Sequence, residues 1–140
     1  MLNKHLNYKI NMKNNFIPYA EALALKELGF DGECLVYYNK KELFSFNQTC
    51  NEKLKGHFIK MSNRLCTPLY QQAFKFFRDK YNLLGNVYSN ASGYLWEIHD
   101  DKGGTHRFDS EYYGDELESG TFTTYEKAEL ACLQKLIEVC

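Results

Sequence analysis

The chain has 140 residues, of which 44% are hydrophobic and 25% are charged, and its formal net charge is −1. This composition is typical of a globular protein, and the near-zero charge excludes a strong general attraction to nucleic acid or to anionic membranes. We expect one domain over residues 1–140, with a compact core over 16–140 and residues 1–15 forming an N-terminal strand or an extension.

The charge is divided unevenly along the chain. Residues 1–64 carry ten Lys and Arg against six Asp and Glu, a balance of +4, whereas residues 65–140 carry seven against twelve, a balance of −5. A surface polarised in this way steers charged partners during association.

The five cysteines form no Cys-x-x-Cys pair, and their number is odd. The first 15 residues lack the apolar run of a secretory signal, and no apolar stretch is long enough to span a bilayer. We therefore expect a cytoplasmic protein without membrane contact, whose cysteines are free thiols packed as small apolar groups.

The first elements are a strand and a helix. Residues 6–13 alternate apolar and polar side chains, which predicts a half-buried strand; a basic arm, or an extension ahead of a start at Met12, is the alternative. Residues 17–30 predict a helix, which Pro18 opens and Gly29 ends in a left-handed conformation.

A hairpin is expected next. Residues 34–38 and 42–46 are rich in aromatic and branched side chains and flank a polar turn, so we predict two paired strands with Leu43 opposite Val36. The polar segment 47–66 has no clear assignment beyond a short strand within it.

Residues 67–81 predict the central helix. Thr67 is a suitable N-cap and Pro68 suits the first turn. Four aromatic residues share one face at helical spacing and can anchor a core: Tyr70, Phe74, Phe77 and Tyr81.

A second hairpin is predicted over residues 94–109. A three-residue loop at 101–103 would place Ile98 opposite His106 and Trp96 opposite Phe108, after a turn at 83–87. A four-residue loop would instead make His99 and His106 direct partners.

The acidic stretch 109–120 predicts a solvated loop, and a capping box beginning at Thr123 predicts a last helix to about Val139. Its buried stripe is expected to comprise Tyr125, Ala128, Cys132 and Leu136.

Each predicted helix opens with Tyr-x-x-Ala, at residues 19–22, 70–73 and 125–128. Tyr and Ala three apart share a helix face, where the small Ala allows close packing. The element order (β)-α-β-β-α-β-β-α predicts an α+β fold, in which three helices pack on one antiparallel sheet of four to five strands.

The helical stretches 17–31, 67–81 and 124–138 resemble a group of small proteins carried by phages and prophages of anaerobic bacteria. The resemblance covers somewhat under half of the chain. It implies a phage-borne accessory protein and carries no activity, cofactor or site residue.

The second predicted hairpin contains the candidate catalytic or metal-binding residues. Its imidazoles and carboxylates could serve as metal ligands or as an acid–base pair. In the three-residue register His99 and His106 point to opposite faces and cannot converge on one site. We therefore interpret these residues as ordinary polar residues at the tip of a hairpin. Cys34, Cys50, Cys66 and His57 match no zinc spacing, and no phosphate loop or nucleophile elbow is present. We expect no cofactor, no metal and no enzymatic activity.

A nucleic-acid interface is the alternative from the basic first half, where aromatic residues lie among Lys53, Lys55, Lys60 and Arg64. The near-zero net charge argues against it, because dedicated binders are usually strongly basic. The sequence favours a non-catalytic module that binds a macromolecular partner, counter-defence being one use. Its speculative binding residues are these four with His99 and His106, and a metal-dependent enzyme at 97–109 is the second alternative.

Overall fold

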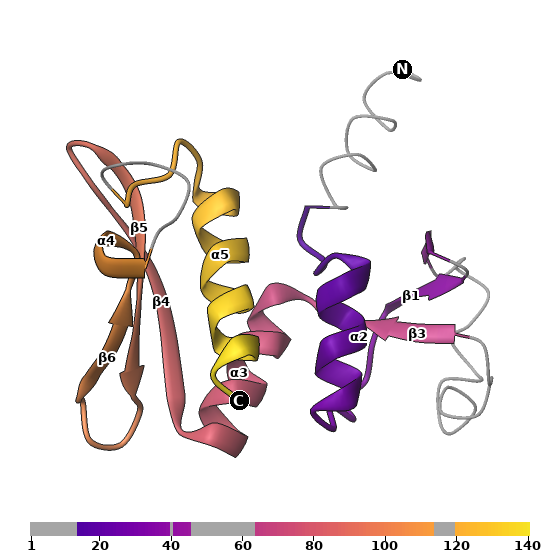
Figure 1. The fold of residues 1–140 in the computed structure, drawn as a ribbon. Coiled ribbons are helices and arrows are strands. Elements are labelled where there is room, and N and C mark those ends of the chain that lie inside the picture. The colour runs from indigo at the N-terminus through magenta and orange to yellow at the C-terminus, as the bar shows by residue number, and fades with distance from the viewer. Residues whose placement is uncertain (1–13, 40, 46–63, 114–119) are drawn as a thin grey trace.

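The computed structural model describes residues 14–39, 41–45, 64–113 and 120–140 (Figure 1). These residues form an α+β fold, which confirms the expected fold class. The expected strand at 6–13 and the segment 46–63 lie outside the described residues. The elements are α2 (Tyr19–Glu27), β1 (Val36–Asn39), β2 (Glu42–Ser45), β3 (Arg64–Thr67), α3 (Tyr70–Tyr81), β4 (Leu83–Asn90), β5 (Gly93–Asp100), β6 (His106–Asp109), α4 (Ser110–Tyr113) and α5 (Tyr125–Glu138).

The described strands divide between two antiparallel sheets, so the expected single sheet of four to five strands is not confirmed. The first sheet has the order β2-β1-β3 and the second the order β4-β5-β6. Each sheet contains one strand that the sequence did not indicate. Strand β3 has only four residues, and β4, expected to be a turn at 83–87, contains Gly85, which weakens the strand pattern.

The helices lie between the two sheets, as Figure 1 shows. Helices α3 and α5 pack on one face of the sheet β4-β5-β6, whereas α2 packs against β3 of the other sheet and also touches α5. The opposite face of β4-β5-β6 we call the outer face; among the described elements, α4 packs against it at one end. None of the helices in the described ranges combines the length and apolar character that a bilayer-crossing segment needs.

The Tyr-x-x-Ala pattern marks the beginning of all three long helices. Tyr19, Tyr70 and Tyr125 are the first residues of α2, α3 and α5. The alanine one turn later is buried in each case, with an exposed fraction of 0–1% at Ala22, Ala73 and Ala128. Because alanine adds only a methyl group, the helix backbone can lie close to its neighbours there.

The helix ends agree with the sequence except at the starts of α3 and α5; Thr124, rather than the expected Thr123, is the N-cap of α5. Gly29 has φ +89° after α2, and the amide of Phe30 donates to the carbonyl of Leu25, as in a Schellman motif. Helix α3 begins three residues later than expected, because Thr67 belongs to β3. The backbone N–H of Leu69 instead donates to Oε1 of Gln72 at 2.9 Å.

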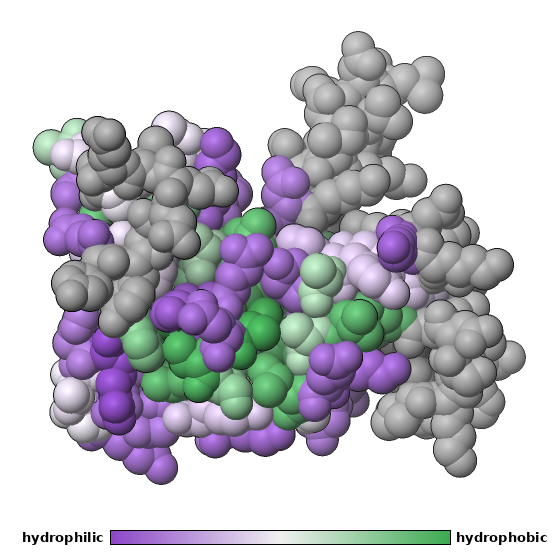
Figure 2. Space-filling view, viewed as in Figure 1, coloured by the Kyte–Doolittle hydropathy of each residue, from purple (hydrophilic) through white to green (hydrophobic). Residues whose placement is uncertain are grey.

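The core joins the three helices to both sheets. Phe77, Leu25 and Leu133 have no exposed surface, and Ile98 on β5 is equally buried. The expected stripe of α5 is confirmed at Ala128, Cys132 and Leu136, whereas Tyr125 is 44% exposed. Figure 2 shows apolar side chains gathered on one side of the molecule, over the region where α5 approaches α3, with polar side chains around them.

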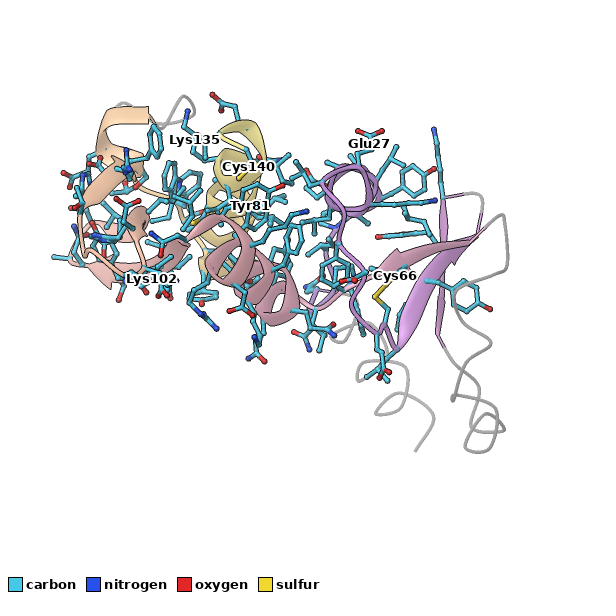
Figure 3. The ribbon with its side chains drawn as sticks, turned by 90° about the horizontal axis from the view of Figure 1, so that it is seen from below. Glu27, Cys66, Tyr81, Lys102, Lys135 and Cys140 are labelled. Carbon is cyan, nitrogen blue, oxygen red and sulfur yellow. A yellow bond between two sulfur atoms is a disulfide. The ribbon has the colours of Figure 1, made fainter. Side chains whose placement is uncertain are left out.

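Cys34 and Cys66 form a disulfide, with 5.7 Å between their Cα atoms (Figure 3), so the expectation of free thiols is wrong for this pair. Their sequence separation of 32 gave no signal, because the bond depends on β1 pairing with β3. Cys132 and Cys140 are free, the first buried and the second exposed.

The first hairpin is confirmed, but its register differs from the expected one. Leu43 lies opposite Tyr38, and Val36 lies opposite Ser45. The turn is therefore shorter than the three residues that the sequence indicated, and Lys41 within it has φ +71°. A short turn with a left-handed residue matches the twist of paired strands.

Candidate binding surfaces

The loop between β5 and β6 has four residues rather than three. The amide of Asp100 donates to the carbonyl of Thr105 at 2.8 Å, and Gly104 takes the left-handed conformation with φ +62°. A bulge follows, so that His99 pairs with His106 and Ile98 with Phe108. The structure therefore has the alternative register, and the expected pairing of Ile98 with His106 is wrong.

This register gathers imidazoles and carboxylates on the outer face. The rings of His99 and His106 lie 5.4 Å apart at 82°. Nε2 of His99 is 3.2 Å from Oε1 of Glu97, and Nε2 of His106 is 3.1 Å from Oδ2 of Asp109. Each ring therefore has a carboxylate partner on its own strand. We call Glu97, His99, His106 and Asp109 the histidine–carboxylate cluster.

Asn86 and Tyr88 extend this cluster along β4. Nδ2 of Asn86 donates to Oε1 of Glu97 at 3.1 Å. Partial burial acts to raise the pKa of Glu97, but hydrogen bonds from Asn86 and His99 outweigh it and lower that pKa. The pKa of Tyr88 is raised by burial and by the negative charges of Glu97, Glu111 and Asp109.

Two observations limit what the cluster can do. Arg107, the residue displaced by the bulge, pairs with Asp100 instead, with its Nη2 3.0 Å from Oδ2. Among the residues that the structure describes, no group of three or more His, Cys, Asp or Glu is arranged to hold a metal ion. The cluster is therefore an acidic, hydrogen-bonding surface with two imidazole rings.

Among the residues that the structure describes, no other predicted binding residue lies on this surface. Lys53, Lys55 and Lys60 lie outside the described residues. Arg64 begins β3 opposite Asn39, in the other sheet, and its side chain is not described. Of the six candidates, the structure brings together His99 and His106 alone.

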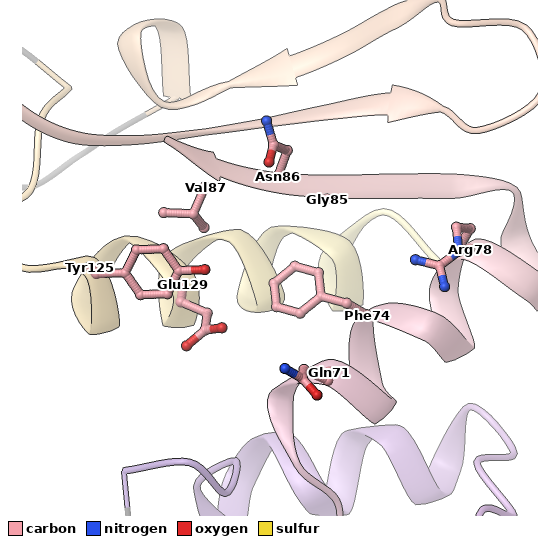
Figure 4. A pocket seen from close by; sticks show the side chains of 8 residues that line it. All are labelled: Gln71, Phe74, Arg78, Gly85, Asn86, Val87, Tyr125 and Glu129. Carbon is pink, nitrogen blue, oxygen red and sulfur yellow. The ribbon is translucent and has the colours of Figure 1, made fainter. Parts of the chain in front are cut away.

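A cleft of about 300 Å³ lies on the other side of β4, between α3 and α5 (Figure 4). Apolar groups from all three elements form much of its wall: Phe74 on α3, Val87 on β4 and the ring of Tyr125 on α5. Gly85 also lines it, where the ring of Phe74 lies against the strand backbone. The polar side chains in the lining are those of Gln71, Arg78 and Glu129; Asn86 contributes its backbone, since its side chain points to the outer face.

Glu129 is the most perturbed carboxyl group of the described chain. Burial, with a smaller contribution from the negative charge of Glu126, raises its pKa to about 7. Its charge in turn adds to the effect of burial in raising the pKa of Tyr70 and of Tyr125. The same side chain lines a second, adjoining cleft with Tyr70 and Gln71.

The sequence did not single out Glu129. It lies one helical turn after Tyr125 on α5, within a stretch that reads as an ordinary amphipathic helix. Its environment comes from α3 and β4, which are distant in sequence, and β4 was itself unexpected. The available signal was that Glu129 lies on the same side of the predicted helix as its buried stripe.

Comparison with known proteins adds no family to these observations. No family model matches the chain, and neither a curated protein nor a solved structure shows significant similarity to it.

Proposed function

We propose that this protein is a non-catalytic accessory protein that binds a macromolecular partner through the outer face of the sheet β4-β5-β6. The partner that fits this face is a protein presenting a basic segment. The setting that we propose is a phage or prophage, where occupation of a host protein, including a defence protein, would be the use of such binding.

The histidine–carboxylate cluster is the observation that carries the proposal. Glu97 and Asp109 stand side by side on paired strands, and Glu111 follows on α4. Tyr88, 37% exposed, offers an aromatic surface among these charges. Acidic groups around an accessible tyrosine suit the lysine and arginine side chains of a partner, because charge guides encounter and the ring supplies contact area.

The arrangement favours binding over catalysis. Both imidazoles already have carboxylate partners, and no Ser, Thr or Cys is recorded hydrogen-bonding to either ring among the described residues. The same negative charges would repel a phosphate backbone, so the nucleic-acid alternative depends on Arg64 in the other sheet and on Lys53, Lys55 and Lys60, which lie outside the described residues. The metal-dependent enzyme at 97–109 stays the second alternative; within the described ranges no group of three or more His, Cys, Asp or Glu is arranged to hold a metal ion.

The cellular location belongs to the proposal as well. We propose the cytoplasm of the phage host. The Cys34–Cys66 disulfide runs against this proposal, since such bonds are uncommon in reducing compartments.

Affinity capture with a matched set of baits tests the function. The baits are the wild-type chain, the variant Glu97→Gln/Asp109→Asn/Glu111→Gln, and the control Glu27→Gln, which removes an exposed charge on α2. We expect wild type and control to enrich the same basic-segment protein from host lysate, and the triple variant to lose it. The proposal fails if the triple variant retains that protein or if wild type enriches nothing over an unrelated bait.

A direct titration then checks the chemistry. The captured protein's basic segment, made as a peptide, should bind wild type with an affinity that falls as salt rises, because exposed charges are screened. A salt-independent affinity would contradict recognition by the acidic face.

A further inference from the structure

We propose that the cleft between α3, β4 and α5 is a binding site for a small zwitterion of the size of a tripeptide. In this site Glu129 receives the ammonium end, Arg78 receives the carboxylate end, and an apolar side chain of the ligand lies on Phe74. The site is separate from the outer face, because β4 stands between them.

The cleft has the mixed lining that small-molecule sites use. Its apolar wall comes from three different elements, and its volume of about 300 Å³ lies at the lower end of the range for ligand pockets. Figure 4 shows Tyr125 and Glu129 at one end of the cleft, Arg78 at the other end, and the ring of Phe74 between them. A ligand with a polar group at each end and an apolar middle matches this order.

Neither of the two charged groups has an ion-pair partner within the described part of the chain. Glu129 and Arg78 form no ion pair with each other or with another described residue, although both are partly buried. Gln71, which lines the cleft near Glu129, also makes no hydrogen bond with another described residue. A partly buried carboxyl and guanidinium without protein partners are available to bind the charged groups of a ligand.

The spacing of these groups sets the length of the ligand. Gln71 lies at the Glu129 end, since both residues also line the adjoining cleft. Arg78 is two helical turns further along α3, which corresponds to roughly 10 Å at 1.5 Å per residue. An extended peptide covers about 3.3–3.6 Å per residue, so three residues bridge that distance with opposite charges at the two ends.

Protonation of Glu129 couples to this binding. An ammonium group beside the carboxylate favours its ionised form and opposes the burial that raises its pKa. The groups that face Glu129 are Glu126, Tyr125 and Cys132 from α5 and Tyr70 from α3, with Arg78 at the far end. Affinity should therefore fall as pH drops below about 7.

Calorimetric titration of the full chain with four peptides tests the site. The probes are glycyl-phenylalanyl-glycine, its N-acetylated form, its C-amidated form, and the form carrying both caps. We expect the uncapped peptide to bind and each single cap to weaken binding about tenfold, the effect of losing one hydrogen-bonded charge.

Variants then assign each end. Glu129→Gln should weaken the uncapped peptide about tenfold and leave the acetylated form unchanged, whereas Arg78→Gln should show the same selectivity for the amidated form. Glu27→Gln and Lys102→Gln, exposed positions elsewhere, are the matched controls, and thermal unfolding verifies that every variant is folded. Absence of saturable binding by the uncapped peptide, or equal weakening of all four peptides by either cleft variant, overturns the proposal.

Discussion

The ring of Phe74 lies directly against the backbone of Gly85, where a side chain of any size would meet it. A β-carbon at position 85 would come within 2.6 Å of Cε1 of the ring and 3.0 Å of the Cys132 sulfur. The glycine therefore lets α3 and α5 approach β4 together, and it also sets the position of the ring that forms the middle of the cleft.

Gly85→Ala should destabilise the fold by about 1–3 kcal/mol, the usual range for overpacking a tight site. Urea unfolding measures the change. Gly103→Ala is the control, since its nearest neighbour would be 3.7 Å away and little change is expected. In the double variant with Phe74→Ala, the effect of Gly85→Ala should shrink, because the ring atoms that make the two shortest contacts are gone and the Cys132 sulfur alone remains. Additive effects would contradict the contact.

The raised pKa of Glu129 makes stability depend on pH in a defined window. Its usual value is 4.5 and its folded value is about 7. Between these values the folded state holds a proton that the unfolded state releases, so the free energy of unfolding falls as pH rises through the window and is level above it. Below 4.5 both states are protonated and the group has no effect.

Glu129→Gln should remove the fall in the free energy of unfolding that rising pH causes, because glutamine does not ionise. The variant should therefore gain stability over wild type progressively as pH rises from 4.5 to 7, and keep that gain at higher pH. Urea denaturation at a series of pH values provides the measurement, with Glu27→Gln as the matched control. A gain that appeared only below pH 4.5 would assign the effect to another carboxyl group.

Reduction of the Cys34–Cys66 bond should lower the free energy of unfolding. A loop closed over a separation of 32 residues contributes about 3 to 4 kcal/mol in the chain-entropy account. Differential alkylation should identify the bonded pair, and denaturant unfolding with and without a reducing agent should give the difference. The variant Cys34→Ser/Cys66→Ser should match the reduced protein and show no response to the reducing agent. A wild-type protein that alkylates fully without reduction would contradict the bond.

Thr67→Val should stabilise the protein. Oγ1 of Thr67 is buried and has no hydrogen-bond partner among the described residues, so a methyl group of similar shape removes a cost of about 1 kcal/mol. Thr124→Val is the control of opposite sign, because Thr124 caps α5 and its Oγ1 accepts from the amide of Lys127 at 3.3 Å. Losing that cap should cost about 1 kcal/mol. Both changes are measured by thermal unfolding.

The helices were predictable because their signals are local. Pro18 and Gly29 bracket α2 within one short stretch, and the Tyr-x-x-Ala pattern coincides with the first turn of each long helix. The last helix ends within one residue of its expected end, at Glu138. Such signals depend on neighbours within a few residues, and strand pairing overrode a cap signal at Thr67, which belongs to β3.

The sheets were less predictable because their partners are distant in sequence. Strand β3 pairs with β1 across more than twenty residues, and nothing in its four residues indicates that pairing. The candidate sites differ in the same way. The pairing of His99 with His106 depends on the length of one loop, so the sequence offered it as an alternative register. The environment of Glu129 depends on the packing of α3, β4 and α5, which the sequence did not indicate.

The bulge after the β5–β6 loop has a consequence for how this surface can change. Strict alternation along β6 would place Arg107 rather than His106 opposite His99, so the extra residue decides whether a guanidinium or an imidazole stands beside the carboxylates of the outer face. Gain or loss of one codon at that point would therefore change which side chain pairs with His99, and with it the charge beside Glu97.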